Sequence, residues 1–378
     1  MPDSGNNYYI GVMSGTSLDA VDVTIATFDD ATTPPLSNSS FEIPQSIRQA
    51  IEALCSPGEN EIHRMSELDN QLAQLFASGI NSSIDALKID RRLIKAIGCH
   101  GQTIRHMPNN KYPYTLQIGN GALISKLTGV TTITDFRRAD IAAGGQGAPL
   151  VPAFHHSIFS STTKNRVVLN IGGMANITIL NSRHPNSISG FDTGPGNVLL
   201  NEWIYLQQNI NCDIDGAWSS KQNAHQQLLN KMLEDSYFHM PPPKSTGREH
   251  FNLSWIKEKL AEIEESIPAP TVQSTLCELS AISICNAIHE YSSNTDDVIV
   301  CGGGIHNKDL VNRMKKISGL NVVSSANFGI DPDFVEATAF AWLAKQTLEG
   351  VAANVPQVTG ANHPVVLGAI YPRSVSGI

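Results

Sequence analysis

Two stretches of this chain run a strand into a small-residue turn and directly out along another strand, and this pattern restricts the fold more than any other feature. The first is YYIGVMSGTSLDAVDVTIATF, residues 8–28, and RVVLNIGGMANITIL, residues 166–180, repeats its layout. A third glycine cluster, residues 302–304, ends a predicted strand and leads into a helix from about Lys308. Backbone N–H groups in glycine turns form nests for anions, and only glycine allows so close an approach. The three turns therefore favour one polyanionic ligand contacted from several sides.

Strand and helix patterns alternate along the rest of the chain. Strands are predicted at 8–13, 20–28, 94–100, 130–136, 166–173, 175–180 and 296–304, and helices at 64–87, 196–208, 270–290 and 332–348. This order predicts layers of helices on sheets, the α/β class. The repeated hairpin has two interpretations: hairpins are common, or the chain consists of two related halves that each offer a glycine turn to a shared ligand.

Composition narrows the classes of function. At 378 residues the length favours two domains, and 41% of residues are apolar. The formal net charge of -9, with no cluster of Lys and Arg, argues against nucleic acid or an anionic membrane as the main partner. No signal peptide is evident, and no apolar run approaches the ~20 residues that span a bilayer. The six cysteines are scattered without a C-x-x-C pair, so we expect reduced thiols and a cytoplasmic protein.

Familiar phosphate and metal motifs are absent from the sequence. There is no G-x-x-x-x-G-K-[ST] loop, no G-x-G-x-x-G fingerprint and no G-x-S-x-G elbow. The twelve histidines show no H-x-x-x-H spacing and do not pair with nearby cysteines. What remains is nucleotide binding by paired hairpins.

Eight motifs, taken in order, resemble those of the anhydro-N-acetylmuramic acid kinase family, in the superfamily of acetate and sugar kinases, heat-shock 70 chaperones and actin. They are VMSGTSLDAVD (12–22), CHGQT (99–103), DFRRADIAAGGQGAPLVPAFH (135–155), NIGGMANIT (170–178), GFDTGPGN (190–197), STGREHF (245–251), CGGGIHN (301–307) and EATAFAWLA (336–344). Together they cover nearly the whole chain and are very specific. One departure is Ala20, where the family's first turn has glycine.

The resemblance implies a two-domain actin-like ATPase fold of the sugar-kinase type, with the active site in the cleft between the domains. We expect residues 1–138 plus 336–378 to form one domain and residues 139–335 the other, with a loop-like break near 135–148. The implied enzyme is a phosphotransferase that opens the 1,6-anhydro ring of its amino sugar with water and moves the γ-phosphoryl of ATP to O6. The product would be N-acetylmuramic acid 6-phosphate, in the recycling of cell-wall sugars. The family further implies ATP and Mg²⁺, a homodimer and the cytoplasm.

The glycine turns are the implied ATP site. Its residues are Gly15, Thr16, Ser17, Leu18, Asp19, Ala20, Val21, Asp22, Gly172, Gly173, Asn176, Gly302, Gly303 and Gly304. A carboxylate facing phosphate oxygens would be repelled, so we assign Asp19 to Mg²⁺ through water. The alternatives are a turn cap for Asp19 and tight packing at strand ends for the glycines.

Asp192, in GFDTGPGN, is the expected catalytic base, because the attacking water must lose a proton and a fixed carboxylate can accept it. We place Asp192 between a strand and a helix, and the alternative is an N-cap of the helix that starts near Pro195. The resemblance assigns the sugar to Thr103, to Arg137 or Arg138, and to Glu336. Adjacent arginines on an extended chain point opposite ways, so only one should face the cleft. Glu336 could instead be a first-turn acid of its own helix.

Two rival functions stay open at this point. One is a kinase of the same fold that acts on an ordinary hexose or amino sugar hydroxyl, with Asp192 deprotonating that hydroxyl. The other is a non-catalytic, ATP-driven clamp of the chaperone or actin type, because fold does not fix function.

Overall fold

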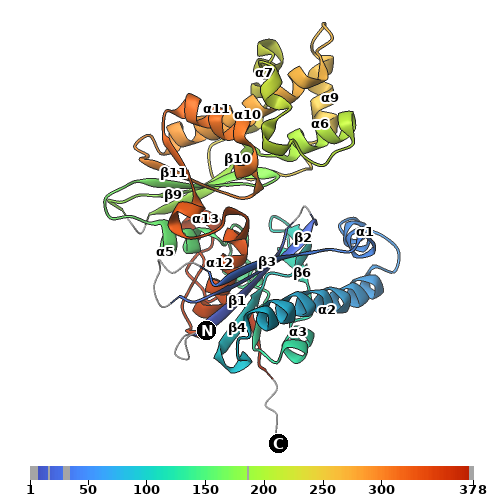
Figure 1. Ribbon diagram of the computed structural model, residues 1–378, viewed down its shortest axis with the longest axis vertical. Coiled ribbons are helices and arrows are strands. Elements are labelled where there is room, and N and C mark those ends of the chain that lie inside the picture. The colour runs from blue at the N-terminus through green and yellow to red at the C-terminus, as the bar shows by residue number, and fades with distance from the viewer. Residues whose placement is uncertain (1–6, 16–17, 29–34, 185–186, 374–378) are drawn as a thin grey trace, which may run out of the picture. The chain divides into compact units, whose positions relative to one another are not determined.

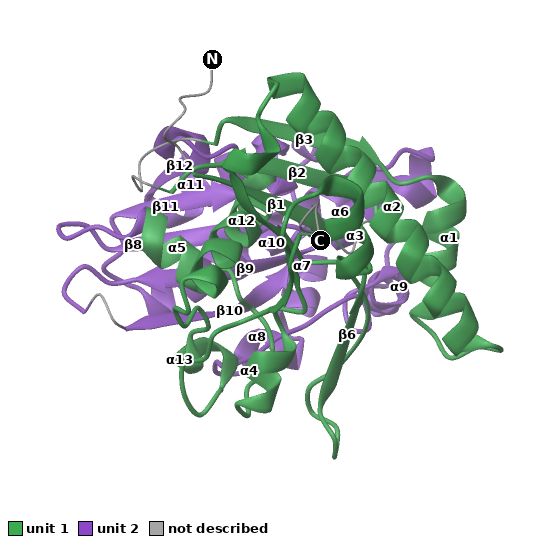
Figure 2. Ribbon diagram, turned by 90° about the horizontal axis from the view of Figure 1, so that it is seen from below, with its two compact units in different colours: residues 1–158, 334–378 green, residues 159–333 purple. Residues whose placement is uncertain are grey.

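The computed structural model describes residues 7–15, 18–28, 35–184 and 187–373. Thr16 and Ser17, two of the predicted ATP-binding residues, lie outside this set. The chain divides into two compact units, residues 1–158 with 334–378 (unit 1) and residues 159–333 (unit 2), which Figure 2 colours separately.

Unit 1 is built on a six-stranded sheet. Its order is β13 (Ala369–Tyr371), β7 (Thr132–Thr134), β4 (Ile94–Cys99), β1 (Tyr8–Ser14), β2 (Ala20–Ala26) and β3 (Ser37–Glu42). Strands β1, β2 and β3 form an antiparallel meander, whereas β4 pairs parallel to β1 and β7 parallel to β4. The small sheet of β5 (Gln102–Met107) and β6 (Tyr114–Ile118) is separate.

Alternating side chains of β1 divide the core of unit 1 into two layers. Tyr8, Ile10 and Val12 pack in one cluster with apolar residues of α2 (Glu61–Leu87), the layer that α1 (Gln45–Leu54) and α3 (Gly121–Thr128) extend (Figure 1). Tyr9 belongs to the other cluster, with Phe340 of α12 (Val335–Leu348).

Helix α12 lies directly on the backbone of the sheet. A Cβ atom at Gly11 would stand 1.7 Å from the carbonyl oxygen of Ala337, and one at Gly98 would stand 2.0 Å from that of Phe340. Only glycine permits this approach, so β1 and β4 each carry one where the helix crosses.

The five-stranded sheet of unit 2 repeats the order of five of the six strands of unit 1, all except β13. Its sheet runs β10 (Ile188–Pro195), β9 (Met174–Leu180), β8 (Arg166–Ile171), β11 (Asp297–Cys301) and β12 (Asn321–Ser324). Here too the first three strands form an antiparallel meander, and β11 and β12 run parallel to β8. The interpretation of two related halves is therefore supported by topology as well as by the repeated hairpin. The predicted α/β class with two domains is confirmed.

Helices supply the other layer of the unit 2 core. They are α6 (Val198–Gln208), α7 (Gln226–Leu233), α8 (Ser236–His239), α9 (Leu253–Ala261), α10 (Ala269–Tyr291) and α11 (Lys308–Ser318). Buried residues of α10, such as Leu276 and Ile284, pack in one cluster with Leu169 and Ile177 of the sheet.

The stretch at 135–148, expected to be a break between domains, packs into unit 1. It contains α4 (Arg138–Ala142), and the fully buried Asp140 accepts hydrogen bonds from the backbone N–H of Gly147 and from the side chains of Asn354 and Thr359, all at 2.7 Å. Thr359 is the last residue of α13 (Pro356–Thr359), and Asn354 precedes this helix. Asp140 therefore connects this stretch to the C-terminal part of unit 1 through hydrogen bonds. The division between units instead falls at the end of α5 (Pro152–Phe159).

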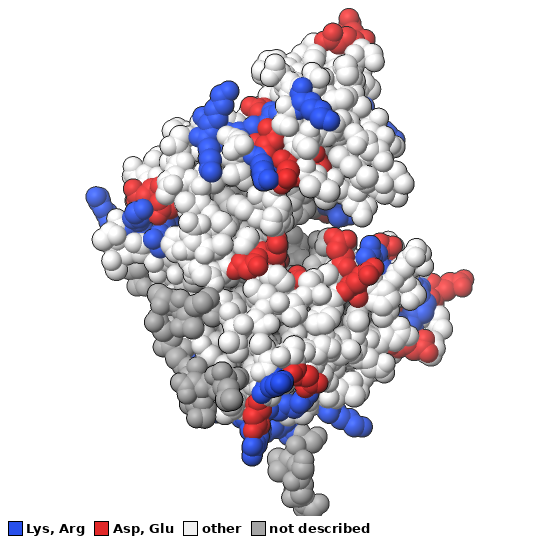
Figure 3. All heavy atoms as spheres, in the orientation of Figure 1, with Lys and Arg blue, Asp and Glu red and all other residues white. Residues whose placement is uncertain are grey.

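The distribution of charged side chains and the apolarity of the helices bear on the partners of this protein. On the face drawn in Figure 3, acidic and basic side chains lie in small mixed groups. Within the described ranges, no helix has both the length and the apolarity needed to cross a bilayer.

Candidate active site

Asp192 lies inside strand β10, not between a strand and a helix. Its Cα is paired with that of Asn176 on β9, and the ladder is irregular between Asp192 and Gly194. Helix α6 begins at Val198, and its N-cap is Asn197, which makes no side-chain capping bond. The N-cap alternative for Asp192 is therefore wrong.

Groups from outside the sheet fix Asp192 on three sides. Its Oδ2 accepts the backbone N–H of Thr246 at 3.1 Å, and its own N–H donates to the carbonyl of Lys244 at 3.2 Å. Its carbonyl accepts the hydroxyl of Tyr237 at 2.7 Å. Lys244 in turn donates its Nζ to the carbonyl of Tyr237 at 3.1 Å and lies 4.8 Å from the centre of that ring. The carboxylate is thus held on a rigid support, as a proton acceptor requires.

The environment of Asp192 shifts the pKa of its carboxyl toward neutral pH. Burial raises the pKa of its carboxyl from 3.8 to about 6, Thr246 lowers this pKa through its N–H, and the nearby Glu249 raises it. A base with such a pKa is mostly ionised at pH 7 and still accepts a proton readily. Perturbed carboxylates of this kind cluster at functional sites.

Asp192 is one of a row of residues that are paired across the neighbouring strands β10, β9, β8 and β11, near the end of the sheet that carries two glycine turns. Asp192 is opposite Asn176, Asn176 is opposite Asn170 of β8, and Asn170 is opposite Cys301 of β11. Directly opposed residues of antiparallel neighbours share a face, so Asp192, Asn176 and Asn170 present their side chains to the same side. The expected base, Asn176 and both turns of unit 2 therefore lie toward the same end of this sheet.

The glycines in these two turns divide into two kinds. Gly302 and Gly304 are required by packing: Gly302 has a φ of +78°, and a Cβ on these two residues would stand 2.3 Å from Asn170 Oδ1 and 2.2 Å from Ile171 Cγ2, respectively. By contrast, Cβ atoms at Gly172 and Gly173 would meet nothing closer than 3.6 Å, and one at Gly303 would meet nothing within 4 Å. Packing thus accounts for Gly302 and Gly304, but the open side of the other three leaves room for a ligand.

Hydrogen bonds from the N-terminal end of helix α6 and the residues just before it hold the turn at Gly172 and Gly173 in place. The carbonyl of Gly172 accepts the N–H of Asn197 at 2.9 Å, and that of Gly173 accepts the N–H groups of Gly196 at 2.9 Å and Val198 at 3.1 Å. These bonds satisfy donors at the start of α6 and make the turn rigid.

The first hairpin, in unit 1, has its described residues on either side of the turn. Gly15 follows β1, and Leu18 adopts a left-handed φ of 59° with a buried side chain, a costly conformation for a branched residue. The Asp19 side chain is 71% exposed, 3.9 Å from Arg48. Ala20, Val21 and Asp22 open β2, and Asp22 accepts the hydroxyl of Ser40 at 2.8 Å.

The residues expected to hold the sugar lie in unit 1, and the two arginines differ sharply. Arg137 is directed inward: its Nε donates to His100 Nε2 at 3.0 Å and its Nη1 to the carbonyl of Gly147 at 2.8 Å. Burial lowers its pKa to about 10, while Glu336 and Asp140 raise it. The Arg138 side chain is 58% exposed and lies 3.4 Å from Asp135. The premise of an extended chain here is wrong, because α4 begins at Arg138.

Glu336 is in the first turn of α12, and its carboxyl interacts electrostatically with the guanidinium of Arg137. Burial raises the pKa of its carboxyl, Arg137 lowers it, and Asp22 raises it. Thr103 of β5 accepts a hydrogen bond from Gln117 Nε2 at 3.1 Å.

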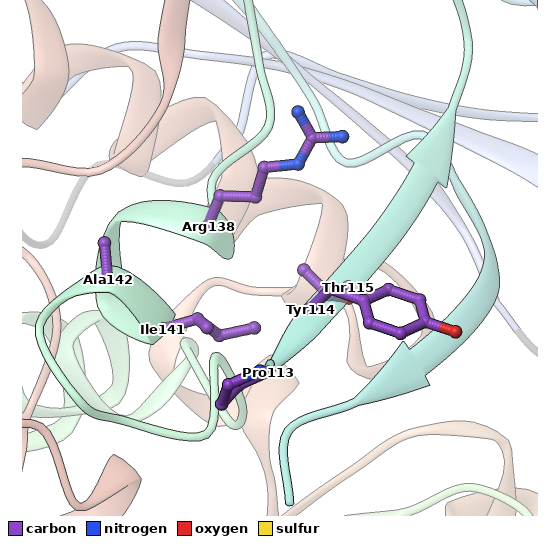
Figure 4. A pocket seen from close by; sticks show the side chains of 6 residues that line it. All are labelled: Pro113, Tyr114, Thr115, Arg138, Ile141 and Ala142. Carbon is purple, nitrogen blue, oxygen red and sulfur yellow. The ribbon is translucent and has the colours of Figure 1, made fainter. Parts of the chain in front are cut away.

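Two neighbouring cavities of unit 1 share Arg138. One, of about 390 Å³, is lined by Arg138, Ile141 and Ala142 of α4 and by residues 113–115 (Figure 4). The other, of about 240 Å³, is polar and includes His100, Gln117, Asp135 and Arg138 in its lining. His100 and Gln117 were not predicted; the motif CHGQT pointed to His100, but no sequence signal marks Gln117.

Comparisons with known proteins agree with these features. The family model described as "Anhydro-N-acetylmuramic acid kinase" matches residues 7–373. A protein of that name from Shewanella pealeana is 44% identical over 368 residues, 97% of this chain and 99% of the relative. Another of that name, from Coxiella burnetii, is 45% identical over 364 residues, 96% of this chain and 97% of the relative.

Among solved structures, component A of the (R)-2-hydroxyglutaryl-CoA dehydratase from Acidaminococcus fermentans aligns with a TM-score of 0.47 and 8% identity. The alignment covers 89% of this chain and 96% of that one. The family match, by contrast, extends over nearly the whole sequence, with relatives at about 45% identity. The chain therefore belongs to the anhydro-N-acetylmuramic acid kinase family.

Proposed function

We propose that this protein is an ATP-dependent kinase that opens the 1,6-anhydro ring of 1,6-anhydro-N-acetylmuramic acid with water and phosphorylates O6. The products are N-acetylmuramic acid 6-phosphate and ADP, and the reaction serves the recycling of cell-wall sugars. Family membership supports the substrate, and the state of Asp192 carries the chemistry.

The observation that carries the proposal is a carboxylate held in a strand, with a pKa of about 6, toward the same end of the sheet as two glycine turns. Water adds to an acetal carbon only as it loses a proton, and Asp192 accepts that proton. The water oxygen bonds to C1 as the C1–O6 bond breaks. O6 then bonds to the γ-phosphorus of ATP as the bond from that phosphorus to the β,γ-bridging oxygen breaks. Phosphoryl transfer itself mainly requires positioning and neutralisation of charge.

Among the open glycines, we assign Gly172 and Gly173 to the phosphates of ATP and Gly303 to its adenosine side. Gly172, Gly173 and Gly303 leave free space where a side chain would stand. We assign them to the nucleotide together with Asn176 and with the first hairpin of unit 1, Gly15 to Asp22.

Magnesium fits this set of residues only in a water-mediated form. Among the described residues, no three His, Cys, Asp or Glu side chains lie close enough to hold a metal ion together. Asp19 offers exposed carboxylate oxygens, the ligand type that Mg²⁺ prefers, although Arg48 competes for them at 3.9 Å. When bound, Mg²⁺ would neutralise phosphate charge, with Asp19 holding it through water.

For the sugar we assign Thr103, Arg137, Arg138 and Glu336. We further propose a homodimer in the cytoplasm, with no nucleic acid or membrane as partner.

Turnover in H₂¹⁸O tests the proposed reaction. If water opens the ring, one heavy oxygen appears at C1 of the product and none in its phosphate, as mass spectrometry of the product and its fragments will show. Label in the phosphate, or an unlabelled sugar, would overturn the mechanism. N-acetylmuramic acid as a control substrate should be phosphorylated far more slowly; equal rates would favour an ordinary sugar kinase.

A further inference from the structure

Two side chains in the lining of the polar cavity of unit 1 each have a buried atom that lacks a hydrogen-bond partner. Its volume is about 240 Å³, and it is lined by His100, Gln117, Thr134, Asp135 and Arg138, among others. His100 Nδ1 and Gln117 Oε1 are both buried and unpaired. Unpaired buried polar atoms are rare in native proteins, so two in the lining of one cavity need an explanation.

The tautomer of His100 is fixed by its neighbour. Arg137 can only donate, so His100 Nε2, which receives its Nε–H at 3.0 Å, carries no proton. Burial, with Arg137 beside it, holds the pKa of His100 well below its usual value, so the ring is neutral and its single proton is on Nδ1. The backbone of Gly101 lies near this atom and raises the same pKa, but not in hydrogen-bond geometry. His100, only 4% exposed, thus has at Nδ1 a donor without a hydrogen-bond partner.

Gln117 offers the complementary acceptor. Its Nε2 donates to the hydroxyls of Thr103 at 3.1 Å and Thr115 at 2.7 Å, which fixes the amide orientation and leaves Oε1 unpaired. The bond to Thr103 also connects this wall of the cavity with a residue that we assign to the sugar. Asp69 and Asn120, also in the lining, already have partners in the N–H groups of Gly119 and Leu123.

We propose that this cavity is the subsite for the acetamido group of the sugar, with His100 Nδ1–H donating to the acetamido carbonyl and Gln117 Oε1 accepting its N–H. The inference rests on the proposed function, because it takes the substrate from there. A planar amide presents its acceptor and its donor on separate atoms that point in opposite directions, which suits a donor and an acceptor on different elements of the lining. The cavity is several times the roughly 30 Å³ that one water occupies in the liquid, so it has space for such a group.

Binding of two sugars that differ only at C2 tests the subsite. Calorimetry on the full chain without nucleotide would compare 1,6-anhydro-N-acetylglucosamine with 1,6-anhydroglucose. We expect the parent to prefer the acetamido sugar by about tenfold or more, since the hydroxyl sugar leaves buried groups unpaired. No preference would overturn the subsite, and water would then be the occupant of the cavity.

A matched pair of variants separates the two sides of the imidazole ring. His100→Gln keeps an acceptor for Arg137 but loses the donor at Nδ1, so its preference should fall to within about threefold. His100→Asn keeps a donor near Nδ1 but loses the partner of Arg137, so its preference should survive even if overall binding weakens. The reverse pattern would contradict the assignment.

Gln117→Met covers the case in which neither His100 variant folds. It removes the acceptor and should lower the preference to a similar extent; an unchanged preference would sink the proposal. A parent enzyme that passes the H₂¹⁸O test but shows no acetamido preference refutes the subsite alone. Preference without phosphorylation refutes the proposed function alone.

Discussion

At the residue scale, the proposed role of Asp192 as the general base can be tested by a single substitution. Replacing it with Asn preserves its shape and an oxygen that can accept the N–H of Thr246, but removes the ability to take a proton. Loss of a general base costs on the order of 10²–10⁴ in rate, so turnover of Asp192→Asn should fall by at least about two decades. Steady-state kinetics check this, with ATP binding as the control that should stay nearly unchanged. Turnover within a few-fold of the parent would show that Asp192 is not the base.

The same variant should be at least as stable as the parent at neutral pH. The pKa of Asp192 in the folded protein, about 6, is above its usual 3.8, so ionisation opposes folding. The stabilising contribution is complete below about pH 4 and is lost as pH rises through about 6. Above pH 7, Asp192→Asn should therefore gain about 1–3 kcal/mol relative to the parent, and the gain should vanish near pH 4.

Chemical denaturation at pH 4 and pH 7.5 measures this difference, and kcat/KM of the parent should fall below about pH 6 as the base is protonated. Destabilisation of Asp192→Asn at pH 7.5 would mean that the charged carboxylate serves the fold instead of the reaction.

At the scale of elements, two adjacent glycines of the turn after β11 form a natural matched pair. A Cβ at Gly304 would stand 2.2 Å from Ile171 Cγ2, whereas one at Gly303 would enter open space. Gly304→Ala should lower stability by about 1–3 kcal/mol through overpacking. Gly303→Ala should melt within a few degrees of the parent but bind ATP at least about tenfold more weakly, because the methyl group fills space that we assign to the nucleotide. Thermal melts with and without ATP distinguish the two; unimpaired ATP binding by Gly303→Ala would remove this turn from the site.

The sequence predicted most elements whose pattern is strongly periodic, including β1, β8, β11, α10 and α12. It missed β3, whose residues SNSSFE are too polar to resemble a strand but pair along the sheet edge with β2. It also listed no strand at β10 and placed Asp192 beyond the end of a strand, whereas ISGFDTGP pairs with β9 despite its glycines and proline.

The site was predicted unevenly for a similar reason. Glycine turns and Asp192 stand in contiguous motifs, so one stretch of sequence suffices to find them. Gln117 becomes relevant only because pairing between β5 and β6 places it opposite Thr103, and the different directions of Arg137 and Arg138 depend on a short helix that the sequence did not reveal.

At the scale of the whole molecule, the duplicated strand order assigns different tasks to equivalent positions. In both units a hairpin follows the first strand, but the residues that we assign to the sugar lie in unit 1, whereas the base and the open glycines 172, 173 and 303 lie in unit 2. Duplication thus provides two similar scaffolds, and the chemistry comes from the loops that each one carries.

The contact between α12 and the glycines of β1 and β4 has a consequence for biosynthesis. Unit 2 is one continuous stretch, residues 159–333, whereas unit 1 needs residues 334–378 to cover its sheet. During translation, unit 2 can therefore complete its core before α12 is available to unit 1. Until then, the face of the unit 1 sheet that contains Gly11 and Gly98 stays uncovered. We therefore expect unit 2 to complete its fold before unit 1, although the N-terminal part of unit 1 leaves the ribosome first.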